Sequence, residues 1–153
     1  MATTKYGGKS IQELSAYTDS IRITHADLTA SSTTQTIQKD VKAGDQVRFV
    51  AYKLHTSFDG GATSALTLNV GDGSDLDRFI DNPSIHADAS AIVFGPQVLP
   101  GTDSIGKVYA VDDTIDILFT ATGANVSVLT AGDIEIFFNI ININNVSDDF
   151  KNS

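Results

Sequence analysis

Apolar residues alternate with polar ones along most of this 153-residue chain. Leu66, Leu68 and Val70, for example, are separated by Thr67 and Asn69. A period of two residues puts every apolar side chain on one face of a β-strand, so each such segment predicts a strand with one buried face. The same pattern recurs at Ile21 and Ile23, at Ile115, Ile117 and Phe119, and in the last apolar segment, Ile134 to Ile143.

Turn residues separate these segments. Ala43-Gly44-Asp45 and Asp59-Gly60-Gly61 are typical turns, and no helical periodicity alternates with the strands. The sequence therefore predicts an all-β fold, an antiparallel β-sandwich that is jelly-roll-like, with about eight strands and one short helix. The expected organisation is an N-terminal arm over residues 1–19, partly helical from Ser10, a β-sandwich domain over 20–143, and a polar tail over 144–153.

Two segments interrupt the simple alternation. The apolar parity changes near Phe49, which predicts a β-bulge or a strand buried on both faces. Farther along, Ser74 can cap a helix on which Leu76, Phe79 and Ile80 share one face. That segment is the predicted short helix.

The later part of the chain mixes loops and strands. Residues 82–104 contain three prolines and predict a long loop with one short strand at the apolar run 91–94. Strands are expected at Lys107 to Val111 and, as a short one, at Val126 to Leu129. Ala131-Gly132-Asp133 repeats the earlier turn sequence and predicts a turn before the last strand.

Composition excludes several classes of protein. The formal net charge is -9 and the pI is about 4.4, which disfavours binding to nucleic-acid phosphates. No cysteine is present, so disulfides, thiolate nucleophiles and zinc–thiolate sites are excluded. The N-terminus lacks the apolar core of a signal peptide and no run is long enough for a membrane span, so we expect synthesis in the cytoplasm and no membrane partner.

The reactive side chains form no recognisable catalytic or ligand motif. His25, His55 and His86 have no metal-ligand spacing, and His55 is expected at the surface or facing a partner. The oxygens of Asp72, Ser74, Asp75 and Asp77 could be offered to Ca²⁺, but the spacing does not fit an EF-hand loop. For Asp72, Asp75 and Asp77 the preferred interpretation is a favourable negative charge at a helix N-terminus. We therefore predict no enzyme activity, no metal and no cofactor.

The last strand is apolar on both faces. Ile134, Ile136, Phe138 and Ile140 share one parity, whereas Phe137, Ile141 and Ile143 share the other. A strand of a two-layer sandwich normally has one polar face. Either the N-terminal segment or the 82–104 loop covers the second face, or that face is a subunit interface. In the arm, Ile11, Leu14 and Tyr17 form a candidate contact stripe at helical spacing.

Three stretches carry a family resemblance: LTASSTTQTI from Leu28, SFDGGATSALTLNVGDGSD from Ser57, and the strand after TAGD at Thr130. Together they resemble the head decoration (auxiliary capsid) proteins of tailed bacteriophages. This resemblance implies a small β-sandwich on the outer surface of the capsid in the virion. It implies non-covalent binding to the major capsid protein, stabilisation of the shell, and a homo-oligomer, with a trimer favoured over a dimer.

The arm over residues 1–19 is then expected to be part of the capsid contact. Two alternatives remain open from the sequence. One is another virion part, such as a head-fibre base or a tail component. The other is a carbohydrate-binding β-sandwich module, although such modules present exposed aromatic side chains and this chain has no tryptophan.

Overall fold

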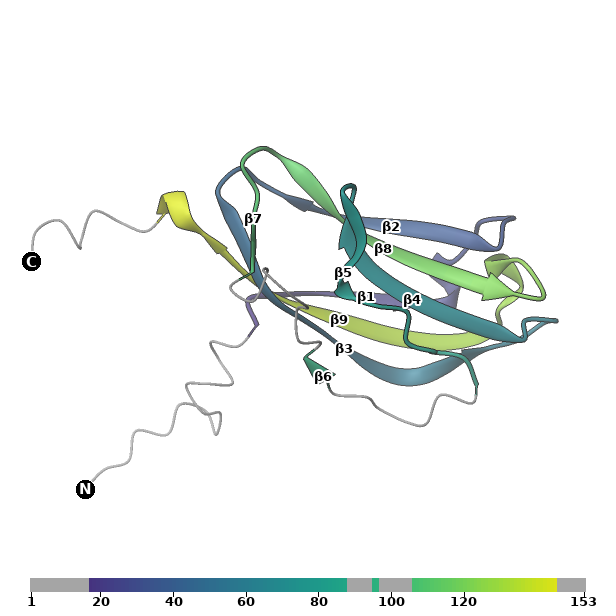
Figure 1. Cartoon of the computed structure of the whole chain (residues 1–153). Helices are drawn as coiled ribbons and strands as arrows, with labels where there is room; N and C mark the ends of the chain where they lie inside the picture. Colours follow the sequence, from purple (N-terminus) through teal and green to yellow (C-terminus); the bar gives the residue numbers. More distant parts are fainter. Residues whose placement is uncertain (1–16, 88–94, 97–105, 146–153) are drawn as a thin grey trace, which may run out of the picture.

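The computed structural model describes residues 17–87, 95–96 and 106–145. These residues form two packed β-sheets joined by turns and by three short 3-10 helices (Figure 1). The strands are β1 (Asp19–Thr24), β2 (Thr34–Val41), β3 (Asp45–Asp59), β4 (Ala65–Asp72), β5 (Asp75–Ile80), β6 (Gly95–Pro96), β7 (Lys107–Val108), β8 (Asp113–Thr122) and β9 (Ala131–Asn142). The 3-10 helices are η1 (His25–Asp27), η3 (Val126–Val128) and η4 (Ile143–Asn145).

The strand order is that of a jelly roll. Sheet A has the order β1-β9-β3-β6, with β7 also paired to β3, and sheet B has the order β2-β8-β4-β5. Every strand pair within the two sheets is antiparallel. If the two-residue β7 is left out and the other strands are renumbered along the chain, the orders become 1-8-3-6 and 2-7-4-5, the two sheets of an eight-stranded jelly roll. The predicted antiparallel sandwich is confirmed.

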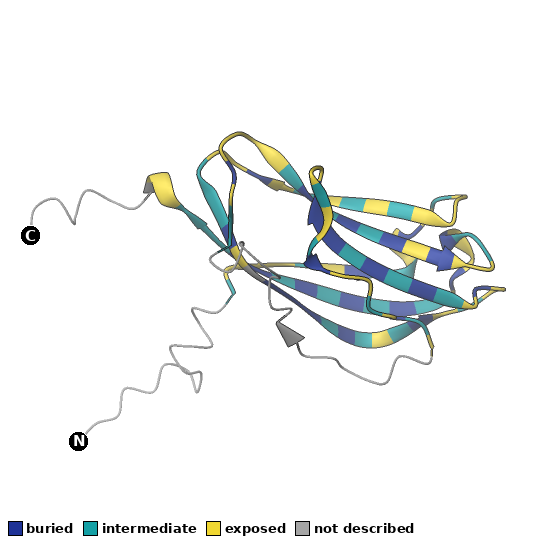
Figure 2. Ribbon diagram, viewed as in Figure 1, coloured by how far each residue is buried: buried dark blue, intermediate teal, exposed yellow. Residues whose placement is uncertain are grey.

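The core lies between the sheets and follows the alternation seen in the sequence. In β4, buried Leu66, Leu68 and Val70 alternate with half-buried neighbours, and β8 shows the same pattern at Ile115 and Ile117. Figure 2 shows this alternation as bands along the strands. The aromatic members of the core are Phe58, Phe79, Phe119 and Phe138, together with Tyr52 and Tyr109.

The predicted bulge is present. The register between β3 and β9 shifts between Val47 and Phe49, so β3 bends there and continues with the opposite parity. Of the three candidate residues in the arm, Tyr17 is described, whereas Ile11 and Leu14 lie outside the described residues. The strand predicted at 91–94 also lies outside them.

Three local predictions were wrong. Residues 75–80 form β5, a strand antiparallel to β4, and not a helix, because the turn at Asp72 returns the chain along sheet B. Val126–Val128 is the 3-10 helix η3 and not a strand. Ala131-Gly132-Asp133 begins β9 and is not a turn, since Asp133 already pairs with Thr24 of β1.

No helix in the described part of the chain is long and apolar enough to cross a membrane.

Candidate functional site

The two apolar faces of β9 have different surroundings. On the inner face, Ile134, Ile136 and Phe138 are fully buried between the sheets. On the outer face, Phe137 and Ile141 are half-buried, and Ile143 follows in η4 with 46% of its surface exposed. The outer face of sheet A therefore carries an apolar strip that the sandwich core does not explain.

Residues 17 and 18 lie on part of this strip. The ring of Tyr17 packs against that of Phe137, with 5.6 Å between their centroids and a tilt of 49°. The Thr18 backbone N–H donates to the Phe138 carbonyl oxygen at 2.8 Å, and its hydroxyl donates to the Ile140 carbonyl oxygen at 3.1 Å. Two of the residues chosen from the sequence as interface candidates, Tyr17 and Phe137, thus contact each other within one chain.

Other residues on the same face are more deeply covered than a two-layer sandwich predicts. Ala51 is opposite Phe137 in β3, and Asn139 lies two residues farther along β9. Both point away from the core, yet only 3% of Ala51 and 5% of Asn139 is exposed. We call the strip of Ala51, Phe137, Asn139 and Ile141 the covered strip.

The other half of the outer face of sheet A is charged. Arg22 of β1 forms a two-pronged ion pair with Asp133 of β9, at 2.9 and 2.6 Å. The hydrogen bond from Arg22 is the main cause that lowers the pKa of the Asp133 carboxyl. His55 lies 3.2 Å from Glu135 on the neighbouring strand. This half has the polar character expected of a solvated sheet face.

The outer face of sheet B is mostly polar, with half-buried Leu118 between Thr36 and Asn69. Thr34, Thr120 and Thr67 lie side by side across β2, β8 and β4. The next polar row toward the β2–β3 turn pairs Gln38 with Asp116, joined by a 3.0 Å hydrogen bond. A row of threonines is typical of a strand face in water. The outer face of sheet B is therefore more polar than the outer face of sheet A at Phe137 and Ile141.

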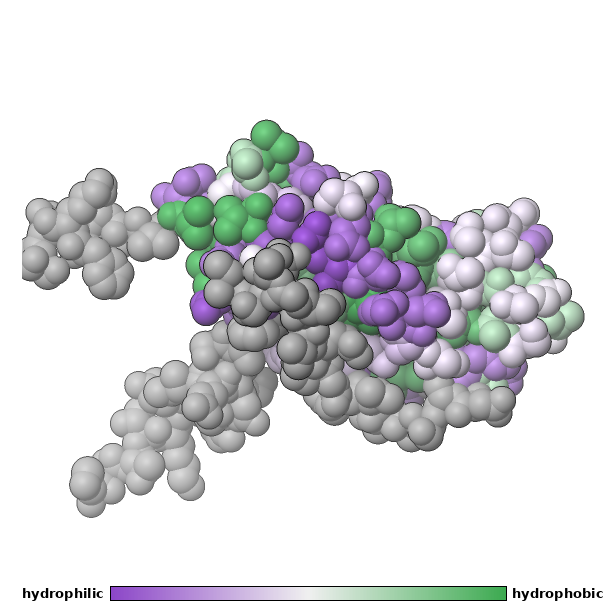
Figure 3. Space-filling model, viewed as in Figure 1, coloured by the Kyte–Doolittle hydropathy of each residue, from purple (hydrophilic) through white to green (hydrophobic). Residues whose placement is uncertain are grey.

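Exposed apolar side chains gather at one end of the sandwich. The described residues include five large hydrophobic side chains that are exposed, and four of them lie at the end that carries β7, η4 and the β4–β5 turn. Figure 3 shows hydrophobic surface at this end, close to β7 and η4. We call this group the apolar end: Leu76 (52% exposed), Val108 (44%), Val111 (68%) and Ile143 (46%). The fifth, Val128, lies at the opposite end in η3.

Hydrogen bonds hold the loops of the apolar end in place. The Asp112 carboxylate accepts a bond from the Ala43 backbone N–H at 2.9 Å and from the Lys42 ammonium at 3.2 Å. Gly44, at a φ of +89°, donates its N–H to the Tyr109 carbonyl oxygen and accepts from Ile143 N–H. Because these loops are fixed, the apolar end presents its side chains at little further entropic cost of ordering.

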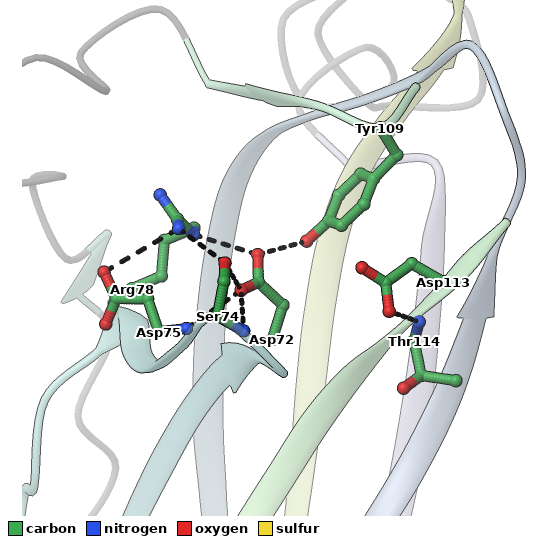
Figure 4. Close-up of polar contacts among 7 residues, drawn as sticks. All are labelled: Asp72, Ser74, Asp75, Arg78, Tyr109, Asp113 and Thr114. Carbon is green, nitrogen blue, oxygen red and sulfur yellow. Dashed lines mark hydrogen bonds and ion pairs between the residues drawn. The ribbon is translucent and has the colours of Figure 1, made fainter. Parts of the chain in front are cut away.

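A buried carboxylate links the two sheets at the same end (Figure 4). Asp72, which is 1% exposed, accepts hydrogen bonds from the Ser74 hydroxyl at 2.6 Å and from the backbone N–H groups of Ser74 and Asp75 at 3.0 Å. Its other oxygen accepts from Arg78 Nε at 2.9 Å and from the Tyr109 hydroxyl at 3.1 Å. Tyr109 is bonded through its backbone N–H to Asp45 of sheet A, so Asp72 connects sheet B to sheet A.

This network accounts for the cluster of acidic residues at 72–77, which the sequence analysis considered as a cation site. The Arg78 guanidinium lies against the Asp72 carboxylate, where a cation would be needed, and the Asp75 carboxylate lies 3.9 Å from Arg78. Asp77 is exposed, and its pKa is raised chiefly by the hydrogen bond it shares with Asp75. No group of three or more His, Cys, Asp or Glu side chains in the described ranges is arranged to hold a metal. The loop acts as a turn.

The network also predicts acid sensitivity. Burial alone would raise the pKa of Asp72, but the hydrogen bonds of Ser74, the charge of Arg78 and the Tyr109 hydroxyl outweigh it and lower the pKa. A lowered folded-state pKa contributes stability above the unfolded value of about 3.9 and loses it as pH falls through the folded value.

We therefore expect urea denaturation of the wild type to show a larger loss of unfolding free energy between pH 6 and pH 2.5 than that of Asp72→Asn. An equal loss in the two proteins would contradict the role of Asp72 in acid stability. The Tyr109 pKa is raised, first by burial and then by the Asp72 charge, so Tyr109 stays neutral throughout this range.

Sequence reasoning missed the partners of two histidines. His55 pairs with Glu135, which lies 80 positions later in the chain. His86 donates a hydrogen bond from Nε2 to the Thr63 carbonyl oxygen at 3.1 Å, in the tautomer that carries the proton on Nε2. His25 lines a shallow depression beside Thr56 and Gly132. None of the three belongs to a group of three or more potential metal ligands in the described ranges.

Comparison with known proteins adds one structure. No protein-family model and no curated protein matches this chain. A solved structure titled "Cyanophage Pam1 capsid asymmetric unit" matches 78% of this chain and 79% of its own, with 16% sequence identity and a TM-score of 0.49. Similarity at this level defines neither a family nor a function. The class of protein that the observed geometry defines is an antiparallel jelly roll with one apolar end.

Proposed function

We propose that this chain is a structural protein of a tailed-phage particle. In this proposal it sits on the outside of the capsid, binds the major capsid protein through non-covalent contacts, and stabilises the shell without any catalytic step. The contact is made by the apolar end. Many copies on one shell add their modest individual contacts, as expected for multivalent binding.

The observation that carries the proposal is the grouping of exposed apolar side chains on fixed loops. Single exposed apolar residues are ordinary on a protein surface, but a group at one place is typical of a protein–protein contact. Leu76, Val108, Val111 and Ile143 come from four different segments that lie at the same end of the sandwich. The polar threonine face of sheet B suits contact with water.

The motifs that resemble decoration proteins support the proposal through their structural roles. The segment VGDGSD forms the β4–β5 turn, in which Asp72 accepts from the Ser74 and Asp75 backbone, and this turn presents Leu76 at the apolar end. The segment SFDGGA supplies buried Phe58 and the turn at Gly60 and Gly61, both at positive φ. A jelly roll alone implies no function; the resemblance and the apolar end together motivate this one.

Two substitutions of valine by aspartate test the contact. We expect Val111→Asp to weaken binding to heads that lack the protein by about tenfold or more, because a charge would be buried against the shell at a cost of roughly 1.4 kcal/mol or more. Val128→Asp is the matched control, since Val128 is also an exposed valine but lies at the opposite end. Co-sedimentation with heads measures both. Equal weakening by the two variants, or none by either, would exclude the apolar end as the contact.

Two alternatives are separable by location and by ligand. If the protein were a head-fibre base or a tail component, an antibody against it would label the fibres or the tail of intact particles and not the capsid faces. A carbohydrate-binding module would stack sugars on an open aromatic surface. Here Tyr17 and Phe137 pack on each other and are half-buried. The capsid surface protein is therefore the function that we favour.

The resemblance also implies a homo-oligomer, and a trimer remains our prediction for the purified chain. Light scattering across a concentration series measures it directly. If the purified protein is a monomer at high micromolar concentration, self-association would occur only on the shell, where neighbouring copies are held close together.

A further inference from the structure

The outer edge of β2 is a free strand edge in the described part of the chain. β2 is the terminal strand of sheet B and pairs on one side only, with β8 (Figure 1). The Ala121 N–H donates to the Thr33 carbonyl oxygen, so this opposed pair is hydrogen-bonded, and bonded pairs alternate along an antiparallel ladder. The backbone N–H and C=O groups of Thr36, Gln38 and Asp40 therefore point to the free edge.

The other sheet edges among the described strands are blocked or short. At the β1 edge of sheet A, the Ser20 N–H donates to the Asp19 carboxylate at 2.8 Å. The Thr24 N–H donates to the Asp27 carboxylate, also at 2.8 Å. β5 pairs with β4 through a register shift, and β6 and β7 have two residues each. Proteins blunt their strand edges in such ways because a free edge pairs with other strands. An edge without these devices is therefore a candidate for a partner strand.

The β2 edge is regular and its side chains leave it open. The eight residues of β2 pair with β8 in one unbroken register and include neither proline nor glycine. An inward-pointing lysine can blunt an edge, but the Lys39 ammonium is paired with Asp19 of the same chain. Gln35 also binds its own chain, since its side-chain amide donates to the Asp27 carbonyl oxygen at 2.8 Å. Neither polar side chain of the inner face therefore projects across the edge.

The sequence of β2 is complementary to itself. We propose that β2 pairs antiparallel with β2 of a second copy of this chain, about a two-fold axis at Ile37, and joins the two B sheets into one continuous sheet. In this register Ile37 lies opposite its own counterpart, and no like charges face each other. The other opposed pairs, each formed twice across the axis, are Thr36 with Gln38, Gln35 with Lys39, and Thr34 with Asp40.

The neighbouring registers are less favourable. If the axis moves to Gln38, Ile37 lies opposite Lys39, and if it moves to Thr36, Ile37 lies opposite Gln35. Of these registers, the axis at Ile37 alone places the partly buried Ile37 side chain against another apolar side chain. This self-complementarity favours a second copy of the chain over an unrelated extended segment.

The contact goes beyond the proposed function and does not depend on it, because two copies would pair with or without a capsid. It uses the edge of sheet B and leaves the apolar end for the shell. A two-fold contact predicts species with an even number of chains, such as a dimer or a pair of trimers.

Amide hydrogen exchange of the full chain, followed by NMR at rising protein concentration, tests the contact directly. We expect the amide protons of Thr36, Gln38 and Asp40 to exchange about tenfold more slowly when about nine in ten chains are paired, because they exchange from the free monomer. The Arg22 amide, on the blocked edge of β1, is the control and should keep its rate.

Two double variants provide a matched pair. Thr36→Glu with Gln38→Lys places opposite charges across the axis, whereas Thr36→Lys with Gln38→Lys places like charges there. The change at Gln38 is common to both, so its effect on the bond to Asp116 cancels. We expect the like-charged variant to associate about tenfold more weakly in sedimentation equilibrium.

Three results would overturn the proposal. They are a strict monomer at high micromolar concentration, an oligomer in which the β2 amide protons keep their monomer exchange rates, and equal association of the two double variants. The capsid contact is measured separately, by co-sedimentation with heads, so failure of the β2 contact and failure of the proposed function are distinguishable.

Discussion

Replacing Asp72 by Asn is expected to lower the free energy of unfolding by about 3 kcal/mol, because it removes one partner of a buried charge pair. The Arg78 side chain is only 12% exposed and would keep its charge without a carboxylate beside it. The Asn amide also places N–H donors where Asp72 now accepts from Ser74 and Tyr109. The loss would loosen the link between the sheets at the apolar end.

Urea denaturation followed by far-ultraviolet circular dichroism measures this effect, since the chain has no tryptophan for fluorescence. Asp40→Asn is the matched control, because Asp40 is an exposed strand aspartate on β2 and its change should stay within about 0.5 kcal/mol. If Asp72→Asn lost no more than this control, the network of Figure 4 would contribute no stability.

Replacing Gly132 by Ala is expected to destabilise the fold by about 3–5 kcal/mol through backbone strain and overpacking. Gly132 has a φ of +142°, a conformation that side chains rarely adopt. A Cβ there would lie 2.1 Å from Cδ1 of Phe58, which is fully buried. Phe58 would have to leave its place against Phe119, where the ring centroids are 5.9 Å apart.

Thermal unfolding measures this second effect, and a drop of about 10 °C corresponds to the lower part of the range. Gly73→Ala provides the control, since a Cβ at Gly73 would meet no atom within 4 Å. The expected change there is small. A melting temperature for Gly132→Ala equal to that of the control would mean that β9 and Phe58 can shift without cost, against the packing described here.

The alternation of residues was sufficient to predict the sandwich, because burial of one strand face is a local pattern. It gave the strands at Ile21, Leu66 and Ile115 and the bulge near Phe49. It failed at 74–80, where Leu76, Phe79 and Ile80 have helical spacing but the chain forms β5. The Asp72 carboxylate binds the backbone N–H groups of Ser74 and Asp75 and closes a hairpin, which outweighs a short helix with no partner.

The candidate site was only partly predictable, because contacts distant in sequence decide it. Phe137 and Ile141 showed in the sequence that β9 has a second apolar face, and Tyr17 was selected separately as a contact residue of the arm. No local pattern predicted that Tyr17 and Phe137 contact each other. The apolar end was missed, since Leu76, Val108 and Val111 look like ordinary single residues until the topology brings their segments together. The Asp72–Tyr109 bond spans 37 positions, and no spacing rule predicts it.

Cryo-electron microscopy of heads that lack the protein, before and after adding it, tests the central claim most directly. The account predicts new density on the outer surface of the shell, into which the jelly roll fits with Val108, Val111 and Ile143 toward the major capsid protein. Bare heads at saturating protein, or density in which the threonine face of sheet B contacts the shell, would contradict it.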